Sequence, residues 1–515
     1  MRLDEAPIKF GRLGGAMPIA IATVSPAEWS ATAQAIALAG HRLIALWGSD
    51  RRDLDDGFVV YAAYAVADGL ACARLMLSGE SPSYPDVSMH FPAANRMQRA
   101  AFDMVGLRAN GAADERPWLR HGAWPPDYFP LRRDTDGARS FATEQERYPF
   151  VSVSGDGVHE IPVGPIHAGI IEPGHFRFSI VGEKVLRLEE RLGYVHKGIE
   201  KRFEGMSLNE GHRLAGRVSG DSTVAYAWAY AMAAESATGT EIPPRAAWLR
   251  ALLLERERVA NHLGDLGALG NDAALAFGLA QFSRLRELWL RANGRVFGHR
   301  LLMDCIVPGG VAVTPDRTGL EEVRAQCLEI EREVRRLRTI YDEHAGLQDR
   351  FQTTGIVKPE LAALLGLTGL AGRASGIAHD LRVDLPCSPY DALNVAIARD
   401  SRGDVAARVA VRFDEITESL RLIRAIVEQM PAGDSRVAFA EPAAPRFGVG
   451  WVEGWRGEVL VALETDASST VRRCHCHDPS WQNWPLIEHA VIGNIVPDFP
   501  LINKSFNLSY SGQDL

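Results

Sequence analysis

The 515-residue sequence has no long hydrophobic run, no strongly basic tract and few cysteines. A helix needs about 18 or more apolar residues in a row to cross a bilayer, so any membrane association is expected to depend on a partner. The net charge of −9 carries no Lys- or Arg-rich block, which argues against nucleic acid and anionic lipid as direct partners. No glycine-rich loop follows an apolar strand, so no phosphate or NAD site of that type is expected.

The cysteines are scattered: Cys72, Cys305, Cys327, Cys387, Cys474 and Cys476. The first residues include an acidic pair and no continuous apolar stretch, a pattern unlike a secretory signal. We therefore expect reduced cysteines in a cytoplasmic compartment, with Cys305, Cys327 and Cys387 filling core positions.

What is present indicates a large globular protein. Hydrophobic residues make up 46% and charged residues 23%, and the length requires two or three domains. We predict an α+β chain with a small α/β domain at 1–135, a polar linker at 136–157 and a larger domain at 158–515. In the first domain, strand candidates at 41–49, 57–67 and 71–79 precede a strand–turn–helix unit that ends near Gly106.

The larger domain is expected to be a central bundle of long helices with short peripheral sheets. Short strands are predicted at 158–190, and long helices begin near 245, after Pro315 and after Asp404. Apolar residues recur every three or four positions along each helix, so these faces must be buried together. The segment 446–515 is predicted to return to short strands and turns.

Motifs in this second domain resemble one family of large subunits. They include GPIHAG and YVHKGIEKR within 164–206, RVFGHRLLMDCIVPGGV at 295–311 and RGDVAARVAVRFDEI at 402–416. In this order they resemble the large subunit of energy-converting NiFe hydrogenases of the formate hydrogenlyase and hydrogenase-4 type. More distantly, they are similar to the quinone-site subunit of respiratory complex I. The first domain resembles the smaller complex I subunit that is often fused to it.

The resemblance implies an oxidoreductase subunit that works only within a complex. Its expected partners are a small iron–sulfur subunit and integral membrane subunits, which would hold it on the cytoplasmic side of the inner membrane. It would pass electrons from the iron–sulfur partner to a quinone-like or other small acceptor, coupled to ion translocation. The alternative is a non-catalytic scaffold that links a soluble redox arm to ion-pumping membrane subunits.

The cysteines that hold the metal centre in these hydrogenases are missing. The four matching positions are Ser219, Ser222, Ser509 and Gly512. Nickel and iron need ionised thiolates, whereas a serine hydroxyl stays protonated near neutral pH and glycine has no ligand atom. We therefore predict no NiFe centre, no metal and no cofactor held by this chain, apart from a possible quinone. Ser219, Ser222 and Ser509 are instead expected to line the former cavity, which suits a small polar ligand or ordered water, and with His167 they are the candidate cofactor-binding residues.

The resemblance to complex I marks a second set of candidates. His167 matches the histidine that bonds a quinone carbonyl, and it is otherwise a loop histidine bonded to backbone. The companion tyrosine falls at or next to Gly220, with Tyr226 six residues on. Glu200 resembles the acid that passes protons in hydrogenases, or else it pairs with Arg217. Arg217, also a candidate catalytic residue, would form a retained wall of the former cavity or merely a salt bridge. Asp221, also a candidate catalytic residue, would add to the polar lining.

One local cluster, Cys474-His475-Cys476-His477, contains metal-ligand residue types. No second cysteine pair lies nearby, and we expect the two thiols to point to opposite sides of a strand, so a closed metal site is not predicted. His475 or His477 is instead expected to border the former cavity.

Overall fold

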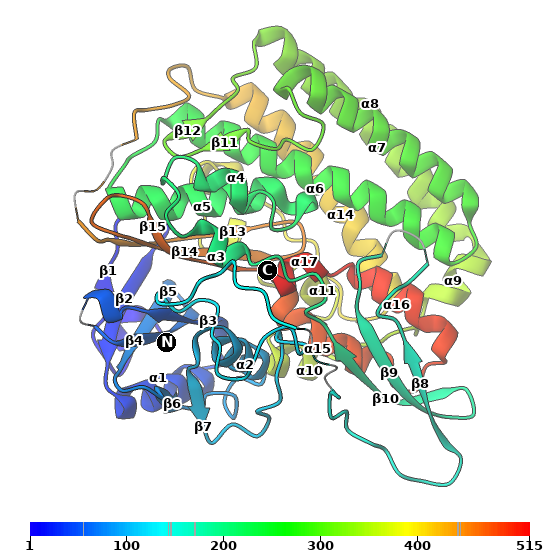
Figure 1. Cartoon of the computed structure of the whole chain (residues 1–515). Helices are drawn as coiled ribbons and strands as arrows, with labels where there is room; N and C mark the ends of the chain where they lie inside the picture. The colour runs from blue at the N-terminus through cyan, green and yellow to red at the C-terminus, as the bar shows by residue number, and fades with distance from the viewer. Residues whose placement is uncertain (55, 143, 145–146, 169–170, 440–441, 443) are drawn as a thin grey trace.

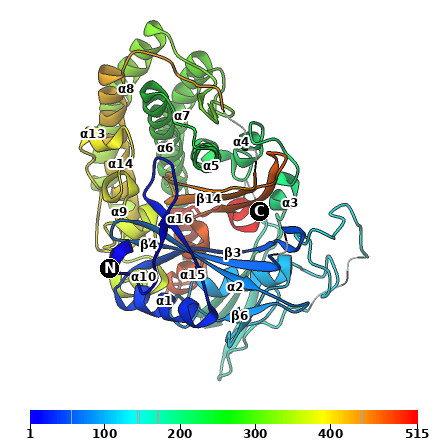
Figure 2. The same cartoon turned by 90° about the vertical axis from the view of Figure 1, so that its left-hand side faces the viewer.

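The computed structural model describes all of residues 1–515 except 55, 143, 145–146, 169–170, 440–441 and 443. A sheet-containing N-terminal part, blue in Figure 1, packs below a set of long helices, and the C-terminal strands run between them. Figure 2 shows the same order from the side, with β14 between the N-terminal sheet and the bundle. The predicted combination of helices and short sheets is confirmed.

The N-terminal domain is built on one five-stranded sheet of order β1-β2-β5-β4-β3. β2 and β5 are parallel and the other neighbours are antiparallel. The strands are β1 Gly11–Arg12, β2 Ile19–Val24, β3 Arg42–Asp50, β4 Phe58–Val66 and β5 Gly69–Leu77; the helices are α1 Pro26–Leu38 and α2 Ala94–Val105; a short pair is β6 Ser83–Pro85 with β7 Arg108–Asn110. The three predicted strands and the helix ending at Gly106 are present. The expected strand before that helix is wrong, because residues 88–90 form a turn.

A three-stranded antiparallel sheet opens the second domain, as predicted. It comprises β8 Val158–Val163, β9 His175–Val181 and β10 Lys184–Arg191. The domain limits stay predictions. Polar contacts nevertheless join parts of the chain that lie far apart in the sequence. Arg51 donates to Glu464 at 2.7 Å, and Tyr61 donates to the same carboxylate at 3.1 Å.

The helical bundle contains the three predicted long helices and two others. Its members are α5 Thr223–Thr238, α6 Pro244–Asp272, α7 Ala276–Phe297, α8 Arg317–Glu343 and α14 Val405–Gln429. Nearly every residue of α5 is buried, so its sequence has no polar face and no helical period to detect. Short elements lie along the chain before, between and after these helices: α3 Ile199–Phe203, α4 Gly211–Ala215, η3 Gly220–Ser222, β11 Ile306–Val307, β12 Gly310–Val311, α9 Ala345–Phe351, α10 Pro359–Leu365, α11 Gly369–Arg373, α12 Leu381–Asp384 and α13 Tyr390–Leu393.

A C-terminal sheet packs directly on α5. Its antiparallel strands are β13 Phe447–Glu453, β14 Glu458–Thr465 and β15 Val471–His477. Gly448 and Gly450 of β13 lie so close to the backbone of α5 that neither position has room for a Cβ atom. Beyond β15 the expected strands and turns are wrong, because α15 Ser480–Ala490, α16 Phe499–Phe506 and α17 Tyr510–Asp514 follow.

Among the described residues, no helix combines the length and the apolar composition that crossing a bilayer requires.

Candidate functional site

The structure brings together, at the centre of the molecule, the four positions that the resemblance matches to metal ligands, here called the former ligand positions. Ser219 precedes η3 and Ser509 precedes α17, and their Oγ atoms lie 2.9 Å apart. The Ser509 hydroxyl also accepts the Gly512 backbone N–H at 2.8 Å, which caps α17. The Ser509 N–H donates to Ser480 Oγ at 2.9 Å. These groups therefore satisfy one another and hold two distant segments together.

An ion pair completes the cluster on the side of Ser222. Arg456 Nη1 donates to Asp221 Oδ1 at 2.8 Å and to Ser222 Oγ at 3.2 Å. Ser219 Oγ donates to the same Asp221 oxygen at 2.7 Å. Burial raises the pKa of Asp221, but the Arg456 guanidinium and these hydrogen bonds outweigh it, so the net pKa lies below its usual value. Asp221 is thus a charged anchor of the network.

Asp478 fills the fourth position. A Cβ atom added to Gly512 would lie 2.6 Å from Asp478 Cγ, closer than real Cβ contacts come. Asp478 is held there because Tyr226 donates its hydroxyl proton to Oδ2 at 2.8 Å and Ser480 donates its backbone N–H to Oδ1 at 2.9 Å. The Tyr226 hydroxyl is therefore bonded to Asp478, and it does not take the place of the tyrosine that accompanies the quinone-binding histidine in the complex I subunit.

These residues do not fit a NiFe centre. Three hydroxyls and a glycine supply no thiolate, and the space of the fourth ligand is taken by a carboxylate. A cavity beside Asp221, lined also by Asn261 and Arg286, encloses about 10 Å³. Since ligand pockets span roughly 300–1,000 Å³, this cavity is also too small for a quinone headgroup.

His167 lies outside this cluster. Its side chain is half-buried, and its Nε2 atom contacts the Gly174 carbonyl oxygen at 2.8 Å. The backbone-bonded arrangement is thus the one present. Beside this loop, His175 Nδ1 lies 3.3 Å from the Gly164 carbonyl oxygen, and His175 borders a hollow of about 700 Å³.

Glu200 does not pair with Arg217, so that prediction is wrong. Arg217 forms an exposed ion pair with Asp304, with Nη2 and Oδ2 2.8 Å apart. Glu200, on α3, instead meets Arg473 at 3.0 Å and the Nδ1 atom of His475 at 2.7 Å. Burial raises the pKa of Glu200, but these two neighbours more than compensate and bring it to about 2. Glu200 is therefore ionised.

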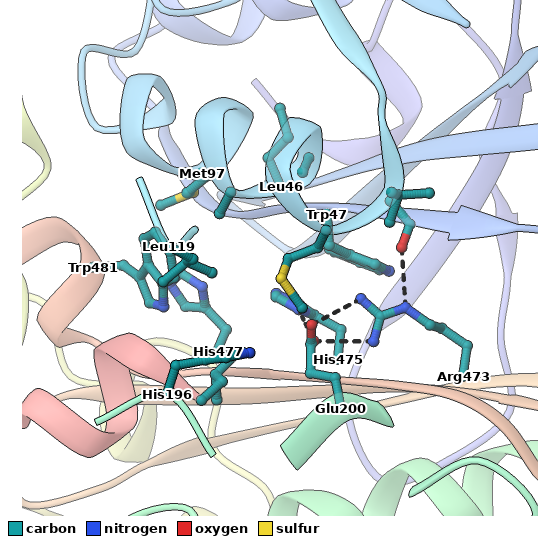
Figure 3. Close-up of a pocket in the computed structure, with 16 residues that line it drawn as sticks. Leu46, Trp47, Met97, Leu119, His196, Glu200, Arg473, His475, His477 and Trp481 are labelled. Atoms are coloured by element: carbon teal, nitrogen blue, oxygen red, sulfur yellow. Dashed lines mark hydrogen bonds and ion pairs between the residues drawn. The ribbon is translucent and has the colours of Figure 1, made fainter. Parts of the chain in front are cut away.

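The Cys-His-Cys-His segment ends β15, and its geometry corrects two expectations: the sides to which the thiols point and the cavity that the histidines border. Cys474 Sγ and Cys476 Sγ are 4.0 Å apart on the same face, because residues two apart on a strand point the same way. His475 and His477 point to the other face and border a cavity against the N-terminal domain, not the serine cluster (Figure 3). In the described part of the chain, no group of three or more His, Cys, Asp or Glu has the arrangement of a metal site.

Sequence reasoning missed Arg456, Asp478 and Arg473. Arg456 is 235 positions from its partner Asp221, and Arg473 is 273 positions from Glu200. No local signal marks them, because β15 has the largely polar sequence VRRCHCH although all of its residues are buried.

Comparisons with known proteins agree with this architecture. Residues 22–140 match the family described as respiratory-chain NADH dehydrogenase, 30 Kd subunit, and residues 272–447 match that described as the 49 Kd subunit. Formate hydrogenlyase subunit 5 of Escherichia coli is 32% identical over 92% of this chain and 85% of its own length. Hydrogenase-4 component G of the same organism is 32% identical over 91% of this chain and 83% of its own length.

Two further comparisons concern proteins with lower sequence identity. The C/D subunit of the NADH-quinone oxidoreductase of Bacteroides thetaiotaomicron is 27% identical over 83% of this chain and 86% of its own length. A chain in the structure of the membrane-bound sulfane sulfur reductase, an archaeal respiratory membrane complex, superposes with a TM-score of 0.66 and 24% identity. That match covers 70% of this chain and 99% of the other, and it supports the fold alone.

Proposed function

Because the chain belongs to the family of large subunits that includes formate hydrogenlyase subunit 5, hydrogenase-4 component G and the C/D subunit of NADH-quinone oxidoreductase, we propose that it is the metal-free large subunit of a membrane-associated oxidoreductase complex. In this role it couples an iron–sulfur partner to integral membrane subunits without H2 chemistry of its own. The matches to respiratory-chain NADH dehydrogenase subunits, and the fold shared with a chain of a membrane-bound respiratory complex, support the membrane association. The cytoplasmic side of the membrane is part of the same proposal.

The observation that carries the proposal is the closed network at the former ligand positions. Ser219, Ser509 and Asp221 bond to one another, and Asp478 fills the space next to Gly512. A site kept for chemistry presents free groups to a substrate-sized cavity, whereas these groups are mutually satisfied. The network is therefore best explained as a structural cross-link that holds η3, α17 and the C-terminal sheet in one rigid scaffold.

A second candidate function is electron transfer to a small quinone-like acceptor. The hollow of about 700 Å³ beside the His167 loop favours it. Its rim includes the aromatic rings of Tyr148, Phe150 and Tyr194, and the buried Nε2 atom of His175 has no hydrogen-bond partner among the described residues. This volume falls within the usual range for ligand pockets.

Turnover of the assembled complex separates the two functions. The native complex is isolated with its subunits identified, and activity per assembled complex is compared for the wild type, His167→Ala, His175→Ala and Ser219→Ala. The scaffold role predicts unchanged turnover in all three variants. A loss of roughly tenfold or more in His167→Ala or His175→Ala, with Ser219→Ala unaffected, would instead establish the acceptor site.

A further inference from the structure

A run of stacked aromatic rings joins the N-terminal sheet to the C-terminal sheet, and it carries an inference that is independent of the function proposed above. Trp47 of β3 stacks on Tyr61 of β4, with 5.0 Å between the ring centroids and 10° between the ring planes. His475 of β15 stacks on Trp47 with the same separation and angle, and Figure 3 shows these two residues next to each other. Phe447 of β13 stacks on Tyr61 at 5.3 Å and 3°. Side chains from four strands thus form one continuous stack.

Three of the four rings are closed off from solvent. Tyr61 is 1% exposed, Trp47 is 3% exposed and His475 is 6% exposed, whereas Phe447 is half-buried. Parallel rings at these separations are in the offset-stacked arrangement, in which their π electrons are in contact. An oxidant in solution therefore comes within one ring of Tyr61 at the exposed part of Phe447.

The Tyr61 hydroxyl donates to a carboxylate that can accept its proton. The acceptor is Glu464 Oε1 at 3.1 Å, within the hydrogen-bond reach over which protons are transferred. Burial raises the pKa of Tyr61 well above its usual value, helped by the Glu464 charge, so the reduced phenol keeps its proton. The other oxygen of Glu464 accepts from Arg51 at 2.7 Å, and Arg51 also pairs with Asp56 at 2.7 Å. Arg51 therefore keeps a counter-charge when Glu464 is protonated.

The stack and the carboxylate together suit Tyr61 to the loss of one electron. Removing an electron from a buried ring leaves a positive charge in an apolar interior, which is costly. Transfer of the hydroxyl proton to Glu464 removes that charge from the ring. We propose that Tyr61 and Trp47 form a one-electron oxidation site, a sink for oxygen-centred radicals, in which Tyr61 ends as a neutral radical and Glu464 holds its proton.

The atoms and electrons of this step balance. The hydroxyl or carbonate radical takes one electron from the stacked rings and is reduced to hydroxide or carbonate. The O–H bond of Tyr61 breaks, its proton moves to Glu464 Oε1, and the unpaired electron stays on the Tyr61 ring and oxygen. Trp47 shares the positive charge until the proton has moved and is unchanged at the end.

Other buried tyrosines lack one or both of these features. Tyr226 and Tyr390 also donate to carboxylates, at 2.8 and 2.7 Å. The ring of Trp228 lies 6.4 Å from that of Tyr390 at 23°, and no ring of the described residues stacks on Tyr226. Tyr64, on the same strand as Tyr61, has a buried hydroxyl without a hydrogen-bond partner in the described part of the chain. The radical is therefore expected to settle on Tyr61.

Radical oxidation of the full chain tests the site. Carbonate radicals generated by pulse radiolysis are the probe, and the EPR spectrum of the rapidly frozen protein reports the radical formed. We expect a tyrosyl signal, most of which is lost in Tyr61→Phe and kept in the matched controls Tyr64→Phe and Tyr226→Phe. Trp47→Leu, which removes the stacked ring, should also lower the signal. A signal that Tyr61→Phe or Trp47→Leu leaves unchanged, or that a control lowers as strongly, overturns the proposal.

Two further measurements isolate the proton transfer. Glu464→Gln keeps an oxygen that accepts the hydrogen bond but cannot take the proton, so the tyrosyl signal should fall as far as in Tyr61→Phe. In the wild type, the signal should form more slowly in D2O than in H2O, because the O–H bond breaks during the step. Equal rates of formation in the two solvents would refute the proton transfer, whether or not the Gln variant folds.

Discussion

Asp478 occupies the space that a side chain on Gly512 would need, because a Cβ atom there would lie 2.6 Å from Asp478 Cγ. Position 512 is where the related hydrogenases are expected to carry a metal-binding cysteine. The carboxylate is held by Tyr226 and Ser480 and cannot move aside without breaking both bonds. The packing around position 512 thus leaves no room for the side chain of a fourth ligand.

Gly512→Ala tests this packing. The added methyl group overpacks a closed site, and we expect a loss of about 1–3 kcal/mol in unfolding free energy. Gly220→Ala is the matched control within the same cluster, because its Cβ would meet only Met303 Cε at 3.6 Å. Thermal denaturation of both variants measures the difference in stability. Equal melting temperatures would show that Asp478 moves aside at no cost in free energy.

The ion pair of Arg456 with Asp221 is expected to stabilise the fold more than that of Arg217 with Asp304. Arg456 is 5% exposed, whereas Arg217 is 43% exposed. Arg456→Met leaves a carboxylate without its counter-charge and should cost about 1–3 kcal/mol, since Asp221 itself is partly solvated. Arg217→Met should cost at most about 1 kcal/mol. Urea unfolding compares them, and the reverse order would contradict the assigned network.

Glu200 gives the stability a predictable pH dependence. Its pKa is about 2 in the folded chain against 4.5 ordinarily, so the ionised group stabilises the fold above pH 4.5. That contribution, about 3 kcal/mol, is lost as the pH falls from about 4.5 towards about 2.

Glu200→Gln should therefore be less stable than the wild type at pH 7, and the difference should shrink on acidification. Glu241→Gln, at an exposed position, is the control. Melting temperatures across this pH range provide the measurement. A difference that stays constant down to pH 3 would show that Glu200 is not held ionised by Arg473 and His475.

Gly450→Ala is expected to disrupt the contact between β13 and α5. No space exists for a Cβ at Gly450, because the backbone of Ala229 lies against it. Backbone separation would cost about 3 kcal/mol or more, visible as a lower melting temperature or insoluble protein. Gly294→Ala, whose Cβ would meet only Arg300 Cγ at 3.6 Å within α7, should be tolerated.

Sequence reasoning reached the elements with a strong period. The helices α6, α8 and α14 carry apolar stripes and clear start signals, β4 is a continuous apolar run, and β3 and β5 are mostly apolar. It failed for α5, which is buried on nearly all sides, and for the C-terminal helices α15 and α16, which are short and carry proline. Their helical conformation depends on tertiary packing against the sheet and the bundle.

The candidate site was predictable only in part. The positions of Ser219, Ser222, Ser509 and Gly512 follow from the motifs around them. The partners Arg456 and Asp478 do not, because each pairs with a residue more than 200 positions away and no local pattern marks them. The partner of Glu200 was misassigned for the same reason, since two buried charges meet across the fold and not along the chain.

The most direct test of the metal-free account is a metal count on the natively isolated complex, combined with an assay of H/D exchange in H2. The account predicts iron from the iron–sulfur partner, no stoichiometric nickel and no exchange. One nickel per copy of this chain, or exchange that depends on it, would contradict the account.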